Sequence, residues 1–99
     1  MKSHSRREAV HARQEITVVN QLGLHARPAA EFVRRANAFR SDIWIVTKAG
    51  RFSALSLLEV MRANLDRGAV ATLEASGPDA EEAVERLAKV VKEMKDYAN

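Results

Sequence analysis

The sequence predicts an α+β domain, in which a small antiparallel or mixed sheet carries helices packed on one face. Two observations lead to this fold class. Apolar side chains alternate with a period of two in some segments and recur every three or four residues in others, in the order β-α-β-β-α-β-α. The connections between these segments mix hairpin lengths with crossover lengths, which is typical of an α+β domain.

The first half of the chain predicts a strand, a helix and a second strand. Residues 15–20 alternate apolar and polar side chains until Gly23 ends the pattern. Residues 26–39 carry apolar side chains at helical spacing, and Pro28 falls in the first turn, where its missing N–H costs nothing. The β-branched and almost continuously apolar run 43–47 predicts the second strand.

The second half predicts a hairpin, a short helix, a strand and a long helix. A turn at 48–50 leads into a short return strand at 51–54. Residues 56–65 predict a short helix that begins near Ser56. Residues 70–75 predict a strand in which alternate residues share a face.

The final helix has the clearest pattern in the sequence. Asp79 follows a Gly–Pro turn and stands where it can cap this helix. Glutamates come early and lysines late, as the helix dipole favours. The predicted buried stripe is Ala80, Ala83, Val84, Leu87, Val91 and Met94.

The composition is that of one soluble globular domain. The chain has 99 residues, of which 46% are apolar and 29% charged, and it has no cysteine. These values exclude disulfide scaffolds and cysteine nucleophiles, and the absence of cysteine fits a reducing cytoplasm. No apolar run reaches the roughly 18 residues of a transmembrane helix, and no apolar segment follows the first basic residues as in a secretory signal.

The positive charge is confined to one end of the chain. The formal net charge of +3 lies within residues 1–14, and residues 15–99 balance their basic and acidic side chains. We therefore expect a flexible basic tail over 1–14 and a folded domain over 15–99. A neutral domain lacks the basic face of a nucleic-acid-binding protein, so we expect no nucleic-acid partner.

A histidine stands at the predicted start of the first helix. His25 follows the turn at Gly23, and the first N–H groups of the helix, those of Ala26 and Arg27, have no intrahelical acceptor. With the helix dipole they form an anion site, to which the Arg27 guanidinium adds donors suited to phosphate. A neutral imidazole beside such a site suits a histidine that accepts and returns a phosphoryl group. The alternative is a histidine that only caps the helix beside a structural arginine.

The sequence contains its own control for this motif. His11–Ala12–Arg13 repeats three of its residues, but without the preceding glycine or the following proline, and within the predicted tail. We therefore interpret His11 as incidental, and His4 likewise.

Three segments resemble the HPr family, the histidine phosphocarriers of the bacterial phosphotransferase system. The first is the active-site segment, Gly23–Leu24–His25–Ala26–Arg27–Pro28–Ala29–Ala30. The second, 56–61, resembles the helix that opens with the family's regulatory serine, and the third is Gly68 with residues 75–83. The resemblance covers roughly residues 15–95, and residues 20–25 look more like the nitrogen-related branch, NPr. It implies an open-faced sandwich of four antiparallel strands with three helices on one side.

The resemblance also implies a function and a set of partners. Enzyme I, charged by phosphoenolpyruvate, would phosphorylate His25 at Nδ1, with Arg27 and the N–H groups of Ala26 and Arg27 holding the phosphate. An enzyme II-type acceptor, an A-type domain or its nitrogen-type equivalent, would then collect it in sugar uptake or nitrogen-related regulation. This makes the chain a cytoplasmic, monomeric carrier rather than an enzyme, without metal or organic cofactor.

The resemblance further implies a docking surface and a regulatory site. We expect partners to dock on Pro28, Leu57, Leu58 and Met61, although an apolar stripe usually belongs to the core. Ser56 is a candidate phosphorylation site for an HPr kinase/phosphorylase, and an N-cap in any case. The alternative function is a regulatory module of the same fold, controlled through Ser56, that relays no phosphate.

The period of the strand at 43–47 predicts where the tryptophan lies. Ile43 and Ile45 are expected to face the helices, which sends Trp44 to the open face of the sheet.

Overall fold

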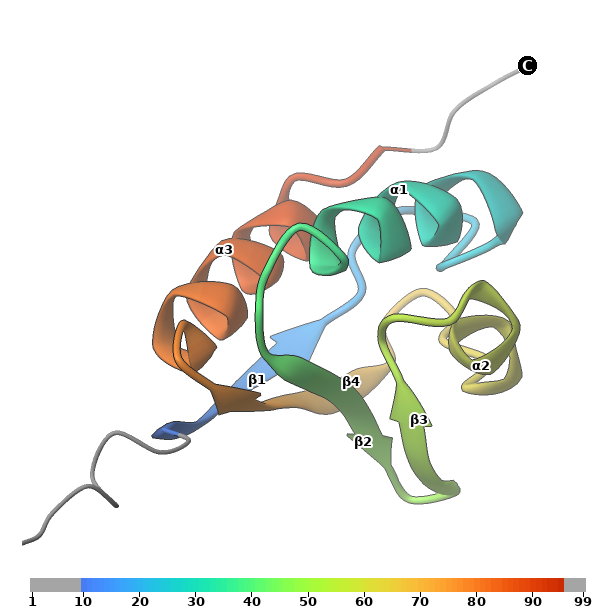
Figure 1. Ribbon diagram of the computed structural model, residues 1–99. Helices are drawn as coiled ribbons and strands as arrows, with labels where there is room; N and C mark the ends of the chain where they lie inside the picture. The colour runs from blue at the N-terminus through green and yellow to red at the C-terminus, as the bar shows by residue number, and fades with distance from the viewer. Residues whose placement is uncertain (1–9, 96–99) are drawn as a thin grey trace, which may run out of the picture.

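Seven segments of regular structure follow one another in the predicted order in the computed structural model, which describes residues 10–95 (Figure 1). None of the helices within that range has the length and apolar character needed to cross a membrane. The elements are β1 (Val10–Thr17), α1 (Ala26–Ala36), β2 (Asp42–Thr47), β3 (Gly50–Ser53), α2 (Leu57–Arg62), β4 (Val70–Gly77) and α3 (Ala80–Lys92).

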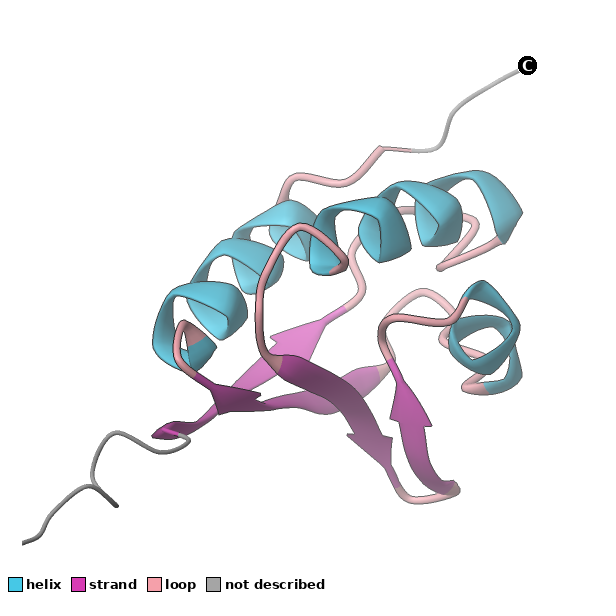
Figure 2. Ribbon diagram, in the orientation of Figure 1, coloured by secondary structure: helices cyan, strands magenta, loops and turns pink. Residues whose placement is uncertain are grey.

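The four strands form one antiparallel sheet in the order β1-β4-β2-β3. Figure 2 shows the helices on one side of this sheet and none on the other, so the predicted open-faced sandwich is confirmed. Alternate strand residues, such as Ile43, Ile45 and Leu73, are buried beneath the helices. They meet the stripe predicted for the last helix, all six members of which are buried.

β1 begins five residues earlier than the pattern predicts. Val10 pairs with Gly77, and the register continues without a break to Thr17 opposite Val70. The predicted boundary at 15 is therefore wrong, because residues 10–14 belong to the sheet. The alternation is weak there because the inward positions are not deeply covered, and Val10 is 41% exposed. The flexibility predicted for the tail now concerns residues 1–9, which lie outside the described range.

Two helices end earlier than their apolar spacing suggests. α1 ends at Ala36, after which the side chain of Asn37 donates from Nδ2 to the carbonyls of Val33 and Leu55. α2 ends at Arg62, and Asn64 then takes a left-handed backbone conformation with φ of 53°. Asparagine tolerates this conformation and so ends the helix, as glycine often does.

Asp79 occupies the N-cap position of α3, but its side chain makes no capping hydrogen bond. The predicted cap is wrong because the carboxylate has partners elsewhere: Ser41 Oγ donates at 2.6 Å and the Arg40 N–H at 2.9 Å. Desolvation acts to raise the pKa of Asp79, but these two hydrogen bonds, a further backbone hydrogen bond at Asp79 and the charge of Arg40 together hold the pKa below its ordinary value. The carboxylate thus ties the loop before β2 to the start of α3.

The open face of the sheet carries a small group of polar and aromatic side chains. Trp44 lies there half-buried, as the strand period predicts, with the Arg51 guanidinium carbon 3.8 Å from its ring centroid. Glu74, on the neighbouring strand, pairs with Arg13 at 3.4 Å and approaches Arg51 at 3.9 Å. Arg51 therefore covers the indole of Trp44 on the face of the sheet that carries no helices (Figure 2).

We expect Arg51→Ala to expose the indole. Trp44 is the chain's single tryptophan, so its emission should shift to longer wavelength and acrylamide should quench it more strongly. The lost cation–π contact should cost about 0.5–1 kcal/mol of stability. Arg13→Ala is the matched control, because it also removes a partner of Glu74 but leaves the ring covered. Equal quenching in the two variants would contradict this role of Arg51.

Candidate functional site

His25 is the residue at which the loop after β1 turns into α1. It is the N-cap of the helix, with an extended backbone (φ −76°, ψ −174°), and its side chain is half-buried. Its carbonyl accepts the N–H of Ala29 at 2.9 Å, but its side chain makes no capping hydrogen bond. His25 thus stands at the N-cap position, but its imidazole does not cap the helix. This weakens the alternative interpretation, in which His25 serves only as a helix cap.

The turn before His25 requires a glycine. Gly23 has φ of +72°, and a Cβ there would lie 2.7 Å from the carbonyl oxygen of Leu65 and 2.8 Å from the Cα of Asp66. Both neighbours are backbone atoms, so the space cannot be opened by turning a side chain. The buried side chain of Asn20 holds the same turn from within by donating from Nδ2 to the carbonyl of Gly23.

Backbone hydrogen bonds fasten this loop to the segment between α2 and β4. Leu24 N–H donates to Leu65 at 2.7 Å, Val18 N–H donates to Ala69 at 2.9 Å, and Gly68 N–H donates to Val18 at 2.8 Å. His25 is therefore positioned by main-chain contacts on both sides of the loop. Sequence reasoning assigned neither Asn20 nor the 65–69 segment a role in holding this turn, because the bonds that join them to it depend on tertiary contact.

The first turn of α1 lies beside His25. Ala26 and Arg27 are exposed and precede Ala29, whose N–H makes the first helical bond to the His25 carbonyl. No acidic residue lies in this turn, and the basic residues Arg34 and Arg35 lie in the last one. The positive end of the helix dipole is thus left to attract an anion next to the imidazole.

Pro28 is fully buried, so its predicted place in a docking surface is wrong. A proline in the first helical turn can turn its ring either outward or inward, and here the ring packs into the core. Its contribution to the site is the fixed backbone angle at the start of α1.

Glu31 forms ion pairs with the two arginines in the last turn of α1. It accepts from Arg34 at 2.6 Å and from Arg35 at 2.7 Å. The hydrogen bonds from Arg35 and Arg34 lower the pKa of Glu31. Beside this group, a shallow hollow of about 290 Å³ is lined by Arg27, Ala30, Glu31 and Arg34.

Ser56 caps α2 as predicted. Its Oγ accepts the N–H of Glu59 at 3.2 Å. The Asn37–Leu55 bond places Ser56 near the end of α1, and the Leu24–Leu65 bond joins the far end of α2 to the loop at His25. Because α1 has 11 residues and is roughly 16 Å long, Ser56 and His25 lie at opposite ends of it.

Three apolar side chains of α2 face solvent. Leu57 is 40% exposed, Leu58 70% and Met61 39%, whereas Val60 supplies the buried side of the helix. These three form the exposed apolar surface of α2. Their exposure fits the predicted docking role better than the alternative that they belong to the core.

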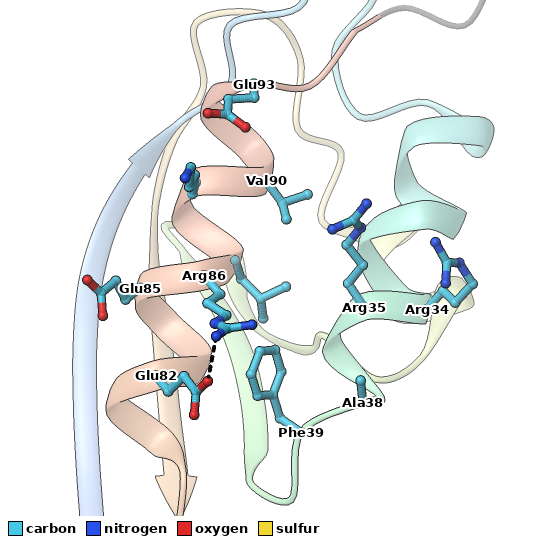
Figure 3. A pocket seen from close by; sticks show the side chains of 11 residues that line it. Arg34, Arg35, Ala38, Phe39, Glu82, Glu85, Arg86, Val90 and Glu93 are labelled. Atoms are coloured by element: carbon cyan, nitrogen blue, oxygen red, sulfur yellow. Dashed lines mark ion pairs between the residues drawn. The ribbon is translucent and has the colours of Figure 1, made fainter.

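A larger hollow lies away from His25. Figure 3 shows it between α1 and α3. Its volume is about 1050 Å³. Charged side chains of both signs surround Phe39 and Val90, and Arg86 pairs with Glu82 at 3.1 Å. His25 does not line this hollow, so the candidate site is an exposed helix start rather than an enclosed pocket.

A family model, curated proteins and solved structures all point to the same family. Residues 12–93 match the family model described as the PTS HPr component phosphorylation site. The chain is 44% identical over 81 residues to phosphocarrier protein HPr of Vibrio cholerae, covering 82% of this chain and 95% of that protein. It is 40% identical to HPr-like protein Crh of Bacillus subtilis, covering 81% and 94%. The crystal structure of HPr from Bacillus anthracis superposes with a TM-score of 0.78 at 37% identity, covering 82% and 96%.

Proposed function

This chain belongs to the PTS HPr family of phosphocarriers, and on that premise we propose that it accepts a phosphoryl group from enzyme I on His25 and passes it to an enzyme II-type acceptor. The observation that carries the assignment to His25 is its place at the start of α1, in a turn fixed by Gly23. The acceptor belongs to sugar uptake or to nitrogen-related regulation, and the transfer takes place in the cytoplasm.

The chemistry needs a nucleophile and a place for the phosphate oxygens. The lone pair of His25 Nδ1 attacks phosphorus as the bond to the donor's leaving group breaks, and attack by a nucleophile of the acceptor then breaks the N–P bond and regenerates the imidazole. Arg27 and the N–H groups of Ala26 and Arg27 hold the oxygens, supported by the helix dipole. Each partner supplies part of the in-line geometry, so the chain acts as a carrier rather than as a catalyst.

The direct test is phosphorylation by a purified donor. The protein is incubated with phosphoenolpyruvate and enzyme I from the same organism, and the product is examined for acid-labile phosphohistidine. We expect one phosphoryl group per chain, at His25. Failure to form it would leave the alternative function, a regulatory module that relays no phosphate.

Partners dock on the exposed apolar surface of α2, formed by Leu57, Leu58 and Met61. Exposed apolar side chains beside a polar site are typical of a surface that meets other proteins. Met61 lies toward the end of α2 that is joined to the His25 loop, so a partner seated there reaches the imidazole.

We expect Arg27→Ala to slow phosphoryl acceptance without abolishing it. Losing a charged hydrogen-bond donor should cost about 10- to 100-fold in rate, since the backbone donors remain. Rapid-mix transfer from phosphorylated enzyme I measures this rate. Arg34→Ala is the control, because Arg34 lies on the same helix and pairs with Glu31. Wild-type rates for Arg27→Ala with every partner would contradict the phosphate-holding role.

Ser56 is a proposed regulatory site that acts on docking. A phosphate at this N-cap meets the positive end of α2, so the fold tolerates it, while about two negative charges fall beside the exposed apolar surface of α2. Because Ser56 and His25 lie at opposite ends of α1, the effect passes through the partner and not through direct contact.

We expect Ser56→Asp to accept phosphate from enzyme I more slowly than Ser56→Ala. Aspartate keeps the cap and adds the charge, whereas alanine removes the cap at a cost of about 1 kcal/mol and adds no charge. Transfer rates and thermal unfolding separate the two effects. Unchanged transfer in Ser56→Asp, together with no labelling by an ATP-dependent HPr kinase, would leave Ser56 as a cap alone.

A further inference from the structure

We infer that Asn20 is a positioning residue for phosphoryl transfer, because its buried amide fixes the peptide that leads into His25. The inference rests on the proposed function and adds to it a residue that acts through the backbone. Asn20 lies in the loop between β1 and α1 and is 6% exposed. Its side chain donates from Nδ2 to the carbonyl of Gly23, two residues before His25.

A buried amide at this place in the fold needs a reason. Only two polar residues are buried within residues 10–95, Asn20 and Ser41. A buried polar group costs free energy unless hydrogen bonds replace the water that it has lost. Ser41 donates to Asp79, at the opposite end of β1 from the His25 loop. An apolar side chain could fill the space of Asn20 without this cost, so what the amide adds is the orientation of the carbonyl that it binds.

Asn20 closes the turn before His25 with two of its groups. Its backbone carbonyl accepts the N–H of Gly23 at 3.1 Å, and its side-chain Nδ2 donates to the carbonyl of the same glycine. Glycine adopts positive and negative φ with similar ease, so Gly23 permits the φ of +72° without enforcing it. The side chain of Asn20 is therefore the group that selects this conformation of the turn.

One peptide plane is held from both sides. The Gly23 carbonyl and the Leu24 N–H belong to the same trans peptide unit, in which the two groups point in opposite directions. Asn20 binds the carbonyl, and the Leu24 N–H donates to Leu65 at 2.7 Å. Rotation of the plane would break both bonds. Leu24 is also buried, so His25 follows a residue whose backbone and side chain are both fixed.

The orientation of this peptide decides where the imidazole of His25 lies. His25 is the next residue after Leu24, and α1 begins directly after it. In-line attack requires the imidazole nitrogen, the phosphorus and the leaving group to be aligned, and a misplacement of about 1 Å can lower a rate by about 100-fold. Loss of the Asn20 amide should therefore lower the rate of transfer and not the affinity for enzyme I, because partners dock on the exposed apolar surface of α2.

Single-turnover transfer from phosphorylated enzyme I tests this separation. We expect Asn20→Ala to lower the maximal rate about tenfold or more, while the enzyme I concentration that gives half of this rate stays within about twofold of wild type. Asn37→Ala is the matched control. Asn37 also donates from Nδ2 to backbone carbonyls, those of Val33 and Leu55, but at the far end of α1 from His25. Equal maximal rates in the two folded variants would overturn the role of Asn20.

Asn20→Asp gives a pH dependence that a merely structural role would not produce, and it keeps the shape of the buried side chain if the alanine variant does not fold. An ionised carboxylate cannot donate and repels the Gly23 carbonyl, whereas a protonated carboxyl can donate to it. Burial raises the pKa of such a carboxyl. We therefore expect the rate of Asn20→Asp relative to wild type to rise as pH falls from about 8 to about 5.5. A ratio that does not change with pH would overturn the proposal.

The comparison with wild type at each pH removes the other titrations near the turn. Enzyme I is the same in both measurements. The charged and titratable groups on the elements around the turn are also the same: His25, Arg27, Asp66, Arg67, Lys92 and Glu93. In Asn20→Ala, which carries no titratable group at this position, the ratio should stay constant with pH.

The wild-type rate separates this inference from the proposed function. A wild-type chain that accepts no phosphate would overturn the proposed function and the role of Asn20 with it. A wild-type chain that accepts phosphate, together with a folded Asn20→Ala that transfers at the wild-type rate, would overturn the role of Asn20 alone. Circular dichroism and thermal unfolding of each variant establish that the rates compare folded proteins.

Discussion

His25→Ala should abolish phosphoryl acceptance and leave the fold intact. The side chain is half-buried at the start of α1, so its removal should cost no more than the loss of a helix cap, about 1 kcal/mol of stability. No other group at the proposed site can replace the imidazole as phosphoryl acceptor. The hydrogen-bond donors there would bind phosphate oxygens but cannot form a bond to phosphorus. Labelling from phosphoenolpyruvate and enzyme I should fall to background while circular dichroism and thermal unfolding stay near wild type.

The chain supplies a matched control for this experiment. His11–Ala12–Arg13 repeats the three residues His25–Ala26–Arg27, but His11 lies in β1 rather than at a helix start. His11→Ala should therefore accept phosphate at the wild-type rate. Full labelling of His25→Ala, or loss of labelling in His11→Ala, would move the acceptor away from the start of α1.

Gly23→Ala should be among the most destabilising single-methyl changes in this protein. The new Cβ meets the backbone of Leu65 and Asp66 below 3 Å, and φ of +72° is itself unfavourable for alanine. We expect a loss of about 3 kcal/mol or more, with slower phosphoryl transfer because His25 is displaced with the turn.

Gly68→Ala separates backbone strain from steric contact. Gly68 also has a positive φ, +86°, but a Cβ there meets nothing within 4 Å. The left-handed backbone alone should cost about 1–2 kcal/mol. Urea unfolding followed by Trp44 fluorescence gives both values, and equal losses for the two variants would show that the contact at Gly23 relaxes without cost.

Sequence periodicity predicted the elements whose faces are fully covered. The buried stripe of α3 and the alternation of β2 are confirmed residue by residue, because both elements have one face against the core. At Val10 the inward-facing side of β1 is only partly covered. The alternation of apolar and polar residues is therefore lost there, although the strand still pairs with β4. Strand pairing there depends on β4, which a local pattern cannot represent.

Predictions from local sequence were wrong where tertiary contacts decided the orientation of a side chain. Asp79 has the right residue type at the right position for a cap, yet Ser41, 38 residues away in the chain, takes its carboxylate. Pro28 has the expected place in the first turn, but the sequence does not tell which way its ring faces. His25 and Arg27 became candidates because they stand at a predicted helix start, which local sequence does encode. Local sequence predicted Ser56 only as an N-cap, and its candidacy for phosphorylation came from the resemblance to the HPr family.

The pairing of β1 with β4 has a consequence for how the chain folds during synthesis. Val10 reaches its partner only when Gly77 is present, so the first strand made waits for the last one. Closing so long a loop is entropically costly, and folding driven by such distant contacts is slow. Until then the edge of β1 and the inner face of β2 are open to other chains. A nascent chain halted before Val70 should therefore remain sensitive to protease, and the sheet should close in one step once β4 has left the ribosome.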